Sequence, residues 1–320
     1  MRYVETSTFG SPEVLRVIEK ETPRAGEGML LVEVQAAGIN YSDVMARSGF
    51  YPAITKAPFA LGFEVAGVVR EVGKGVEGIE VGDTVAAITL AGGGYASHVV
   101  IPAATAIPFP SQLDPAIAAA VLVQGLTAYI LLDQAQVKKG DVILISAAAG
   151  GVGSLAVQLA KARGATVIGL VSESKVDLVK SLGADHVFDY GKAGWSAEAL
   201  DVTRSQGVQV FLDSIGDFAT EAFPLLSQFG RWIIYGVRTG HHNALPAEAV
   251  GPMIEKNISL TGFNLEGSLQ HVPHALGELF QLVINGNVKI EVTKYPLADV
   301  SRVHALFEER KTTGKLVLLP

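Results

Sequence analysis

The stretch Asp141–Gly164 constrains the fold more than any other part of this chain. Its sequence, DVILISAAAGGVGSLAVQLAKARG, puts a short apolar run before a cluster of glycines and an amphipathic helical pattern after it. This order predicts a strand, a tight turn and a helix. Gly150, Gly151 and Gly153 leave the backbone N–H groups of the turn open, and the amino end of the helix adds partial positive charge. The turn is therefore suited to bind a diphosphate.

One position of this turn departs from the G-x-G-x-x-G fingerprint, because Ala148 stands where the first glycine is expected. The turn alone is a weak signal, but apolar runs alternate with helical stretches after it, as in a wound parallel sheet. We predict strands at Val142–Ile145, Thr166–Val171, His186–Phe188, Val208–Asp213 and Trp232–Tyr235. We predict helices at Leu155–Arg163, Lys175–Leu182, Trp195–Ser205 and Phe218–Ser227. The pattern favours an α/β fold with a Rossmann dinucleotide-binding domain; the alternative is a glycine-rich turn without a ligand.

The amino-terminal region has a different pattern. Segments such as LLVEVQAAGIN, FEVAGVVREVG and VGDTVAAI are short valine-rich runs between glycine turns, and no long helix is predicted before about Asp114. We therefore predict a β-rich domain at 1–122, a nucleotide-binding domain at 123–262, and a return of the chain at 263–320 that completes the first domain. The recrossing is expected at Thr261–Phe263.

Composition excludes several classes of protein. A chain of 320 residues that is 49% hydrophobic can form two domains with cores of their own. Its net charge of −7, without clusters of Lys and Arg, argues against nucleic-acid or anionic-membrane partners. The absence of cysteine and of an amino-terminal signal peptide favours a cytoplasmic protein. Pro115–Leu132 is nearly as apolar as a membrane span, but Gln124, Gly125 and Thr127 interrupt it, so we predict a buried helix.

Several segments together resemble the zinc-free, zeta-crystallin-like quinone oxidoreductases of the medium-chain dehydrogenase/reductase superfamily. They are AAGINYSDVMARSGFYP, LGFEVAGVVREVG, VGDTVAAI, DVILISAAAGGVG and KYPLADVSRVHALFEERKTTGKLVLLP. The resemblance runs from about Pro12 to Pro320. It implies a GroES-like β-rich catalytic domain, a Rossmann domain, NADPH as the reductant, a small-molecule quinone or enone as the acceptor, and a homodimer.

A catalytic zinc is not expected. Zinc enzymes of the superfamily hold the metal with cysteine and with the histidine of a Gly-His-Glu element, whereas this chain has Phe63 at that position and no cysteine. Its seven histidines, including the pair His241–His242, have no cysteine or carboxylate at ligand spacing, so no metal site is predicted. Without a Lewis acid, hydride donation to an electron-poor quinone or α,β-unsaturated carbonyl is favoured.

The resemblance assigns four polar residues to the catalytic cleft: Asn40, Asp43, Arg47 and Tyr51. Tyr51 is expected to donate a hydrogen bond to the acceptor oxygen, and Asn40 to orient carbonyl or carboxamide groups. Some members of the family have a second tyrosine where this chain has Met45, which makes that wall softer and less polar. The alternatives are a helix N-cap role for Asn40 and a turn role for Tyr51.

The resemblance and the strand ends together assign the cofactor-binding residues. They are Thr127, Gly150, Gly151, Val152, Gly153, Ser172, Lys175, Tyr190, Ile215, Gly216, Tyr235, Gly236, Phe263 and Lys315. The second strand ends in Gly169-Leu170-Val171-Ser172, without the carboxylate of an NAD site, so NADPH is predicted, although Glu173 lies nearby. The alternatives are helix capping for Ser172 and Ser174 and, for Thr127, a hydrogen bond to its own helix.

These inferences predict an NADPH-dependent, zinc-independent quinone oxidoreductase that transfers hydride from NADPH to quinones or related α,β-unsaturated carbonyls. Two alternatives stay open: an enoyl-thioester or alkenal reductase, and a non-catalytic, crystallin-like NADPH-binding protein. Arg231, Arg238 and Lys256 are too scattered to predict a coenzyme A groove. By analogy with the family, the segment Ser259–Phe263 is a candidate edge for pairing in a homodimer.

Overall fold

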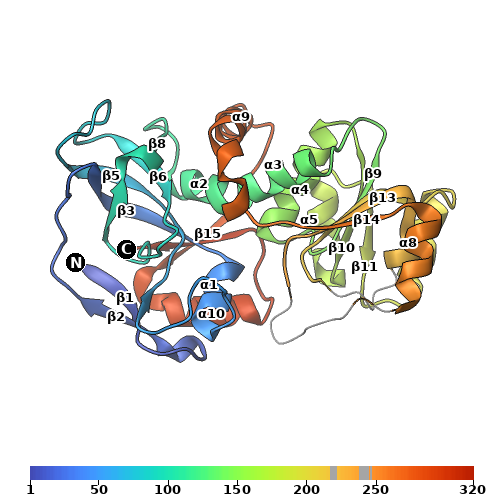
Figure 1. The fold of residues 1–320 in the computed structure, drawn as a ribbon, viewed down its shortest axis with the longest axis horizontal. Helices are drawn as coiled ribbons and strands as arrows, with labels where there is room; N and C mark the ends of the chain where they lie inside the picture. The colour runs from blue at the N-terminus through green and yellow to red at the C-terminus, as the bar shows by residue number, and fades with distance from the viewer. Residues whose placement is uncertain (217–221, 238–244, 246) are drawn as a thin grey trace. The chain divides into compact units, whose positions relative to one another are not determined.

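The computed structural model describes residues 1–216, 222–237, 245 and 247–320 (Figure 1). These residues form two compact units. Unit 1 comprises Met1–Gln124 and Phe280–Pro320, and unit 2 comprises Gly125–Leu279. Unit 1 is thus made of two stretches of chain with unit 2 between them. The predicted division into domains at 1–122 and 123–262, with 263–320 completing the first, stays a prediction.

Unit 1 contains the β-rich part of the chain, as the valine and glycine pattern predicted. Its larger sheet has the order β15-β16-β3-β5-β6-β8, with β7 also paired to β3. The strands are β3 (Met29–Ile39), β5 (Glu64–Val72), β6 (Thr84–Ile88), β7 (His98–Pro102), β8 (Ile107–Pro108), β15 (Val292–Pro296) and β16 (Lys315–Leu319). A smaller sheet joins β1 (Arg2–Thr6), β2 (Leu15–Glu19) and β4 (Phe59–Ala60).

The register of β16 on β3 shows why the second stretch belongs to this unit. Leu316, Val317 and Leu318 pair antiparallel with Ile39, Gly38 and Ala37. The described helices of the unit are α1 (Tyr41–Ser48), α2 (Pro115–Ala120) and α10 (Val300–Glu308), with short 3-10 turns at Pro12–Val14, Ala103–Thr105 and Leu297–Asp299. Leucine and valine side chains of β3, β5 and β16 form the core. Burial of this apolar face drives the pairing.

The apolar segment after Asp114 is a nearly continuous helix in three parts. It consists of α2, a π-helix at Val121–Gly125 (η3) and α3 (Leu126–Gln134). Asp114 caps its amino end, because its carboxylate accepts a hydrogen bond from the Ala116 N–H at 2.9 Å. The segment Pro115–Gln134 is long and apolar enough to cross a membrane, but 83% of the 18-residue stretch that meets this criterion is buried inside the protein. This burial is what the prediction of a core helix requires.

Unit 2 contains a parallel sheet of six strands with the order β11-β10-β9-β12-β13-β14. The strands are β9 (Val142–Ile145), β10 (Thr166–Val171), β11 (His186–Asp189), β12 (Val208–Asp213), β13 (Leu226–Ile234) and β14 (Ser259–Gly262). In chain order this is the 3-2-1-4-5-6 arrangement of a Rossmann fold. The Rossmann prediction is therefore confirmed.

Helices cover both faces of this sheet. They are α4 (Gly151–Ala162), α5 (Val176–Ser181), α6 (Trp195–Val202), α7 (Ala222–Leu225) and α8 (Val250–Lys256), preceded in the chain by α3. Figure 1 shows α4 and α5 on one side of the sheet and α8 on the other. The helix α9 (Val272–Ile284), after the 3-10 turn Glu266–His271, contains the junction at which the chain passes back to unit 1. A sheet covered on both faces explains the uninterrupted apolar runs of β9 and β10.

Several predicted elements of unit 2 differ from the structure. The strand expected at Trp232–Tyr235 begins six residues earlier, at Leu226, and ends at Ile234. The helix expected at Phe218–Ser227 is wrong at its carboxyl end, because Leu226 and Ser227 belong to β13; residues 218–221 lie outside the described part of the chain. Leu226 is buried and pairs with Val208 of β12, so sheet pairing prevails over local helical periodicity. The helix α4 begins at Gly151, earlier than predicted, because the glycine turn itself forms its first turn.

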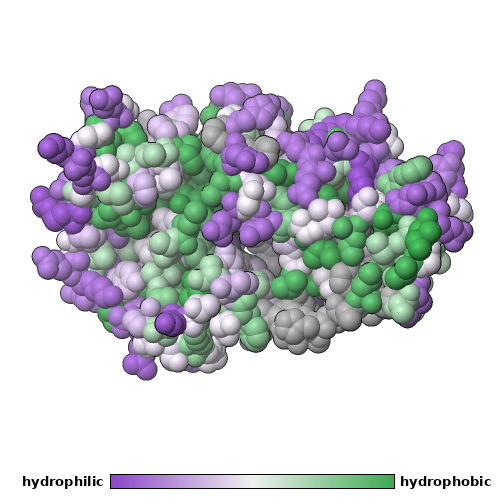
Figure 2. All heavy atoms as spheres, viewed as in Figure 1, coloured by the Kyte–Doolittle hydropathy of each residue, from purple (hydrophilic) through white to green (hydrophobic). Residues whose placement is uncertain are grey.

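The core of unit 2 is organised around Trp232, which is completely buried. Its ring lies 4.9 Å from the ring of Phe211 and 4.6 Å from that of Phe223. On the surface, Val250 and Ile254 of α8 are exposed, and Figure 2 shows apolar surface where Figure 1 has α8. Both cores are mainly aliphatic, but that of unit 2 contains a larger share of aromatic side chains than that of unit 1.

Candidate functional site

Asn40 lies between β3 and α1, at the N-cap position of that helix. Its backbone N–H donates to Asp43 Oδ2 at 2.9 Å, which secures the first turn. Asn40 and Asp43 form the capping box of α1. The Asn40 side chain has two further partners: Nδ2 donates to Glu64 Oε1 at 2.8 Å, and Oδ1 accepts from Lys315 Nζ at 2.7 Å. The helix-capping alternative therefore explains the position of Asn40 but not the partners of its amide.

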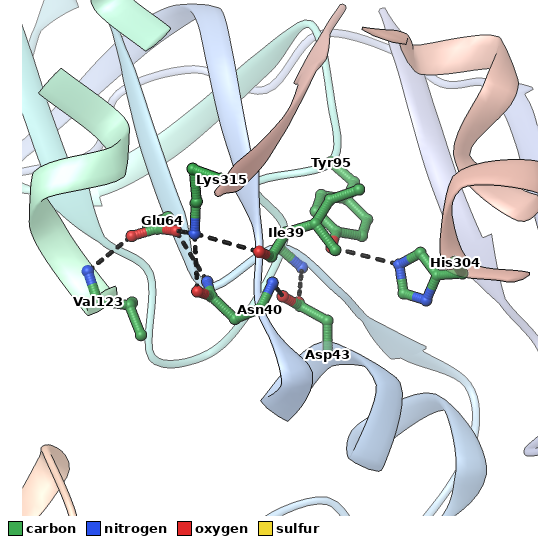
Figure 3. A network of polar contacts seen from close by, with 9 residues as sticks. Ile39, Asn40, Asp43, Glu64, Tyr95, Val123, His304 and Lys315 are labelled. Carbon is green, nitrogen blue, oxygen red and sulfur yellow. Dashed lines mark hydrogen bonds and ion pairs between the residues drawn. The ribbon is translucent and has the colours of Figure 1, made fainter. Parts of the chain in front are cut away.

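Glu64 and Lys315 form a buried ion pair beside Asn40 (Figure 3). Glu64 is the first residue of β5 and Lys315 the first of β16, and their side chains are 0% and 1% exposed. Glu64 Oε2 also accepts the N–H of Val123 in η3 at 2.7 Å. Burial lowers the pKa of Lys315, and the nearby Glu64 carboxylate opposes that shift. The resemblance pointed to Lys315 but not to Glu64, whose only sequence signal is its place after Phe63.

Gly38 provides the space for this pair. A Cβ atom added to Gly38 would collide with the Glu64 carboxylate and lie 2.7 Å from Lys315 Cε. Contacts this short are not tolerated, so a side chain at this position would displace one of the two charged groups. The glycine in the segment AAGIN is thus explained by the packing of two charged side chains against β3.

Asp43 holds two loops together from inside unit 1. Its carboxylate is completely buried and accepts the N–H groups of Asn40 and Gly62, each at 2.9 Å. Burial raises the pKa of Asp43 to about 7, although these two hydrogen bonds favour the ionised form. Gly62 has φ of +91°, and a Cβ there would collide with the backbone N of Tyr95. These contacts are structural, and the predicted catalytic role of Asp43 stays a prediction.

Arg47 and Tyr51 complete the four residues predicted for catalysis. Arg47 Nη2 donates to Glu308 Oε1 of α10 at 2.6 Å, and the Arg47 side chain is 1% exposed. The half-buried Tyr51 ring packs against Phe63 with ring centroids 5.4 Å apart. Phe63 therefore puts an apolar ring where a zinc enzyme of the superfamily has its histidine. The described residues contain no group of three His, Cys, Asp or Glu side chains suited to a metal, and His241 and His242 lie outside that part of the chain.

The glycine turn of unit 2 connects β9 to α4. A Cβ at Gly153 would collide with the carbonyl oxygen of Ala147 and lie 2.8 Å from Ala148 Cα. Ala147 itself has φ of +48°, which turns the backbone sharply after the strand. Gly151, Val152 and Gly153 form the first turn of α4, where N–H groups have no acceptor within the helix. This turn can bind an anion, whereas the Gly150 N–H already donates to Ala147 O at 2.8 Å.

A network of hydrogen bonds joins the carboxyl ends of β9 and β12. Ser146 Oγ accepts the Ser214 N–H at 2.8 Å and lies 3.3 Å from Asp213 Oδ1. Asp213 also accepts the Ile215 N–H at 2.8 Å and Trp232 Nε1 at 3.1 Å. Burial raises the pKa of Asp213, and these donors counteract the shift. Sequence reasoning missed Ser146, whose signal was a polar residue directly after the apolar strand.

This network lies at the topological switch point of the sheet, where dinucleotides bind in Rossmann folds. Most of the predicted cofactor residues follow the ends of the strands at this edge. They are Gly150–Gly153 after β9, Ser172 and Lys175 after β10, Tyr190 after β11, Ile215 and Gly216 after β12, Tyr235 and Gly236 after β13, and Phe263 after β14. Thr127 instead lies buried in α3, and Lys315 lies in unit 1. The fold thus brings twelve of the fourteen predicted residues to one edge.

The end of β10 carries the features that distinguish NADPH from NADH. Leu170 and Val171 are buried, and Ser172 lies at the N-cap of a 3-10 turn without a capping hydrogen bond from its side chain. Glu173 is paired with Lys192 at 3.1 Å, and both side chains are exposed. The Glu173 carboxylate raises the pKa of Lys192 through this hydrogen bond. Glu173, whose negative charge disfavours binding of a 2′-phosphate nearby, is therefore paired with a cation.

Comparisons with known proteins cover the whole chain. Residues 26–111 match the family model of the alcohol dehydrogenase GroES-like domain, and residues 151–283 match that of the zinc-binding dehydrogenases. Quinone oxidoreductase 1 of Escherichia coli is 35% identical over 327 residues, which cover 99% of each chain.

Solved structures agree with these matches. The structure of Escherichia coli quinone oxidoreductase complexed with NADPH has a TM-score of 0.93 and 34% identity, with 100% of both chains covered. A mycobacterial protein complexed with NADPH has a TM-score of 0.91 and 35% identity, again with 100% of both chains covered. The similarity therefore extends to both units of the chain.

Proposed function

Because this chain belongs to the quinone oxidoreductase family of the medium-chain dehydrogenase/reductase superfamily, we propose that it is an NADPH-dependent, zinc-independent quinone oxidoreductase. It transfers hydride from NADPH to quinones or related α,β-unsaturated carbonyls. The observation that carries this proposal is its full-length similarity to a quinone oxidoreductase whose structure contains NADPH.

The strand edge of unit 2 offers the hydrogen-bond donors that NADPH requires. Gly153 is required to be glycine by the backbone around it, and the N–H groups of the first turn of α4 would bind the diphosphate. Ser172 and Lys175 would bind the 2′-phosphate, with Lys192 balancing Glu173. Asp213 holds the loop that carries Ile215 and Gly216 in place. Bound NADPH supplies the hydride.

In unit 1, Asn40 and Tyr51 are proposed to act on the acceptor. An Asn40 amide with fixed orientation offers a hydrogen-bond donor to a carbonyl oxygen, and Tyr51 donates to the oxygen that gains charge. The half-buried Met45 is proposed to provide an apolar contact for a quinone ring. The proton that balances a hydride in two-electron reduction comes from Tyr51 or from solvent.

We also propose a homodimer in the cytoplasm. Among the described strands of unit 2, β14 lies at the edge of the sheet and pairs only with β13. An exposed edge strand is a template for pairing with a second copy. Light scattering is expected to give twice the mass of one chain, and a stable monomer would contradict this proposal.

Oxidation of NADPH in the presence of a panel of benzoquinones, naphthoquinones and 2-alkenals tests the activity. Turnover is expected with NADPH, less with NADH, and Tyr51→Phe and Asn40→Ala are expected to lower kcat while the protein stays folded. Preference for an enoyl thioester would favour the alternative reductase. An NADPH-induced rise in Tm without turnover of any acceptor would instead favour a binding protein.

A further inference from the structure

The side-chain amide of Asn40 can be placed in two orientations of the same shape, so its hydrogen-bond partners decide between them. Glu64 Oε1 accepts only, and Lys315 Nζ donates only. The observed orientation aims Nδ2 at Glu64 and Oδ1 at Lys315. A flipped amide would aim its oxygen at the carboxylate and its NH₂ group at the ammonium. Glu64 and Lys315 therefore fix one of the two orientations.

Lys315 has no ammonium proton left for another partner. Its Nζ atom lies 3.1 Å from the carbonyl oxygen of Ile39 and 2.7 Å from Asn40 Oδ1, and it also contacts Glu64 Oε1. An ammonium group has three protons, and these three acceptors use all of them. A contact of Lys315 with a cofactor phosphate would require one of these bonds to break.

Glu64 joins two segments that are far apart in the sequence. Oε1 binds Asn40 before α1, and Oε2 accepts the N–H of Val123 in the π-helix η3 (Figure 3). The π-helix leads directly into α3, which carries Thr127. A π-helix leaves backbone groups out of the regular α-helical pattern, and such turns are frequent at functional sites. One carboxylate thus binds both the Asn40 amide and the backbone of the π-helix.

A contribution to the stability of the fold does not by itself explain why this chain has a buried ion pair here. Replacing a buried ion pair by apolar residues of similar volume is often neutral or stabilising. The arrangement nevertheless uses every hydrogen-bonding group of Lys315 and both oxygens of Glu64, and it requires glycine at position 38. What this arrangement specifically determines is the orientation of the Asn40 side-chain amide.

We propose that Glu64 and Lys315 are positioning residues of the reductase, which act through the Asn40 amide. With Nδ2 and Oδ1 held by the pair, the second Nδ2 proton stays in one direction for a carbonyl oxygen of the acceptor. This inference rests on the proposed function, because it needs Asn40 to contact the acceptor. It also gives Lys315 a role different from the cofactor contact that the resemblance implies.

A double-mutant cycle tests the inference. Glu64→Gln and the charge-neutral double variant Glu64→Gln/Lys315→Met are expected to lower kcat by about tenfold to a hundredfold, since small misplacements of a contacting group cost this much. The Kd for NADPH, measured by fluorescence, is expected to stay within about twofold. In an Asn40→Ala background the same substitutions are expected to change kcat by less than about twofold. Asp141→Asn, which breaks the Asp141–Arg231 pair in unit 2, is the control.

The outcomes separate the possible explanations. Equal losses of kcat with and without Asn40 would overturn the inference, and so would a tenfold rise of the NADPH Kd in the double variant with unchanged kcat at saturation. If the wild-type protein reduced no acceptor, the proposed function would fail instead. The Asn40 side-chain amide NMR signal, identified by its loss in Asn40→Ala, then tests the positioning itself. An unchanged signal in both Glu64 variants would contradict it.

Discussion

Tyr95 and His304 meet edge to face in the core of unit 1, with Tyr95 Oη 3.4 Å from His304 Nε2 and the ring centroids 5.9 Å apart. His304 belongs to α10, and its side chain is completely buried. Burial, together with the smaller effect of the nearby Arg47 charge, lowers the pKa of His304 from 6.5 to about 3. The imidazole is therefore neutral in the folded protein at physiological pH.

This pair makes unit 1 sensitive to acid. Since the pKa is lower in the folded state, the contribution of His304 is fully present above about pH 6.5 and is lost as the pH falls toward 3. We expect the free energy of unfolding to fall there by about 1.4 kcal/mol per pH unit more in the wild type than in His304→Leu. Urea unfolding followed by circular dichroism over this range measures the difference. Parallel pH profiles of the two proteins would show that His304 titrates normally.

Gly153→Ala is expected to damage unit 2 locally. The new methyl group meets the backbone of Ala147 and Ala148, so unfolding should become easier by about 1–3 kcal/mol, and NADPH should bind at least about tenfold more weakly. Both tryptophans, Trp195 and Trp232, lie in unit 2, so tryptophan fluorescence reports its unfolding. Gly251→Ala in α8, where a Cβ meets nothing within 4 Å, is the control and should be neutral or slightly stabilising. Equal effects of the two substitutions would argue against this account of the turn.

Lys192→Met is expected to weaken the preference for NADPH. It leaves the Glu173 carboxylate without its partner beside the proposed 2′-phosphate site, so the KM for NADPH should rise about threefold to tenfold. The KM for NADH should change by less than about twofold, and Glu173→Gln in the same background should restore the original value. Added salt should reduce the effect, because both side chains are exposed. A parallel rise of both KM values would place Lys192 outside this role.

Dialysis against EDTA is expected to leave turnover unchanged. The chain has no cysteine, and Phe63, at the position of the metal-binding histidine of zinc enzymes, is buried against Tyr51. Metal analysis of the purified protein should find less than about one zinc ion per ten chains. A loss of activity that added zinc restores would require a ligand set that the sequence does not suggest.

The Rossmann unit was predictable from sequence because its signals are local. Apolar runs such as Val142–Ile145 are buried on both faces of a sheet, and the glycine turn follows directly in the chain. The error at Leu226 and Ser227 has the opposite cause. Their local pattern is helical, but a partner strand eighteen residues earlier, at Val208, determines their conformation. Pairing with a distant strand leaves no mark on the paired segment itself.

The polar cluster of unit 1 was predictable only in part. Asn40 and Lys315 were found through the resemblance, but nothing in the sequence connects them with Glu64 or with the N–H of Val123. These residues meet because β16 pairs with β3 and β5 lies on the other side of β3. Asp43 and Arg47 show the converse, since polar residues expected to face a ligand are buried and bind the protein's own backbone and Glu308.

Because unit 1 is made of two separate stretches of chain, its parts become available at different times during synthesis. A ribosome releases β3 and β5 early, then all of unit 2, and β16 only afterwards. Until β16 arrives, the end of β3 at Ala37–Ile39 lacks its antiparallel partner and the Glu64 carboxylate lacks its cation. Unit 2 can fold during this interval, because its strands are contiguous in the chain. A nascent protein is thus able to acquire its nucleotide fold before Asn40 has both partners of its amide.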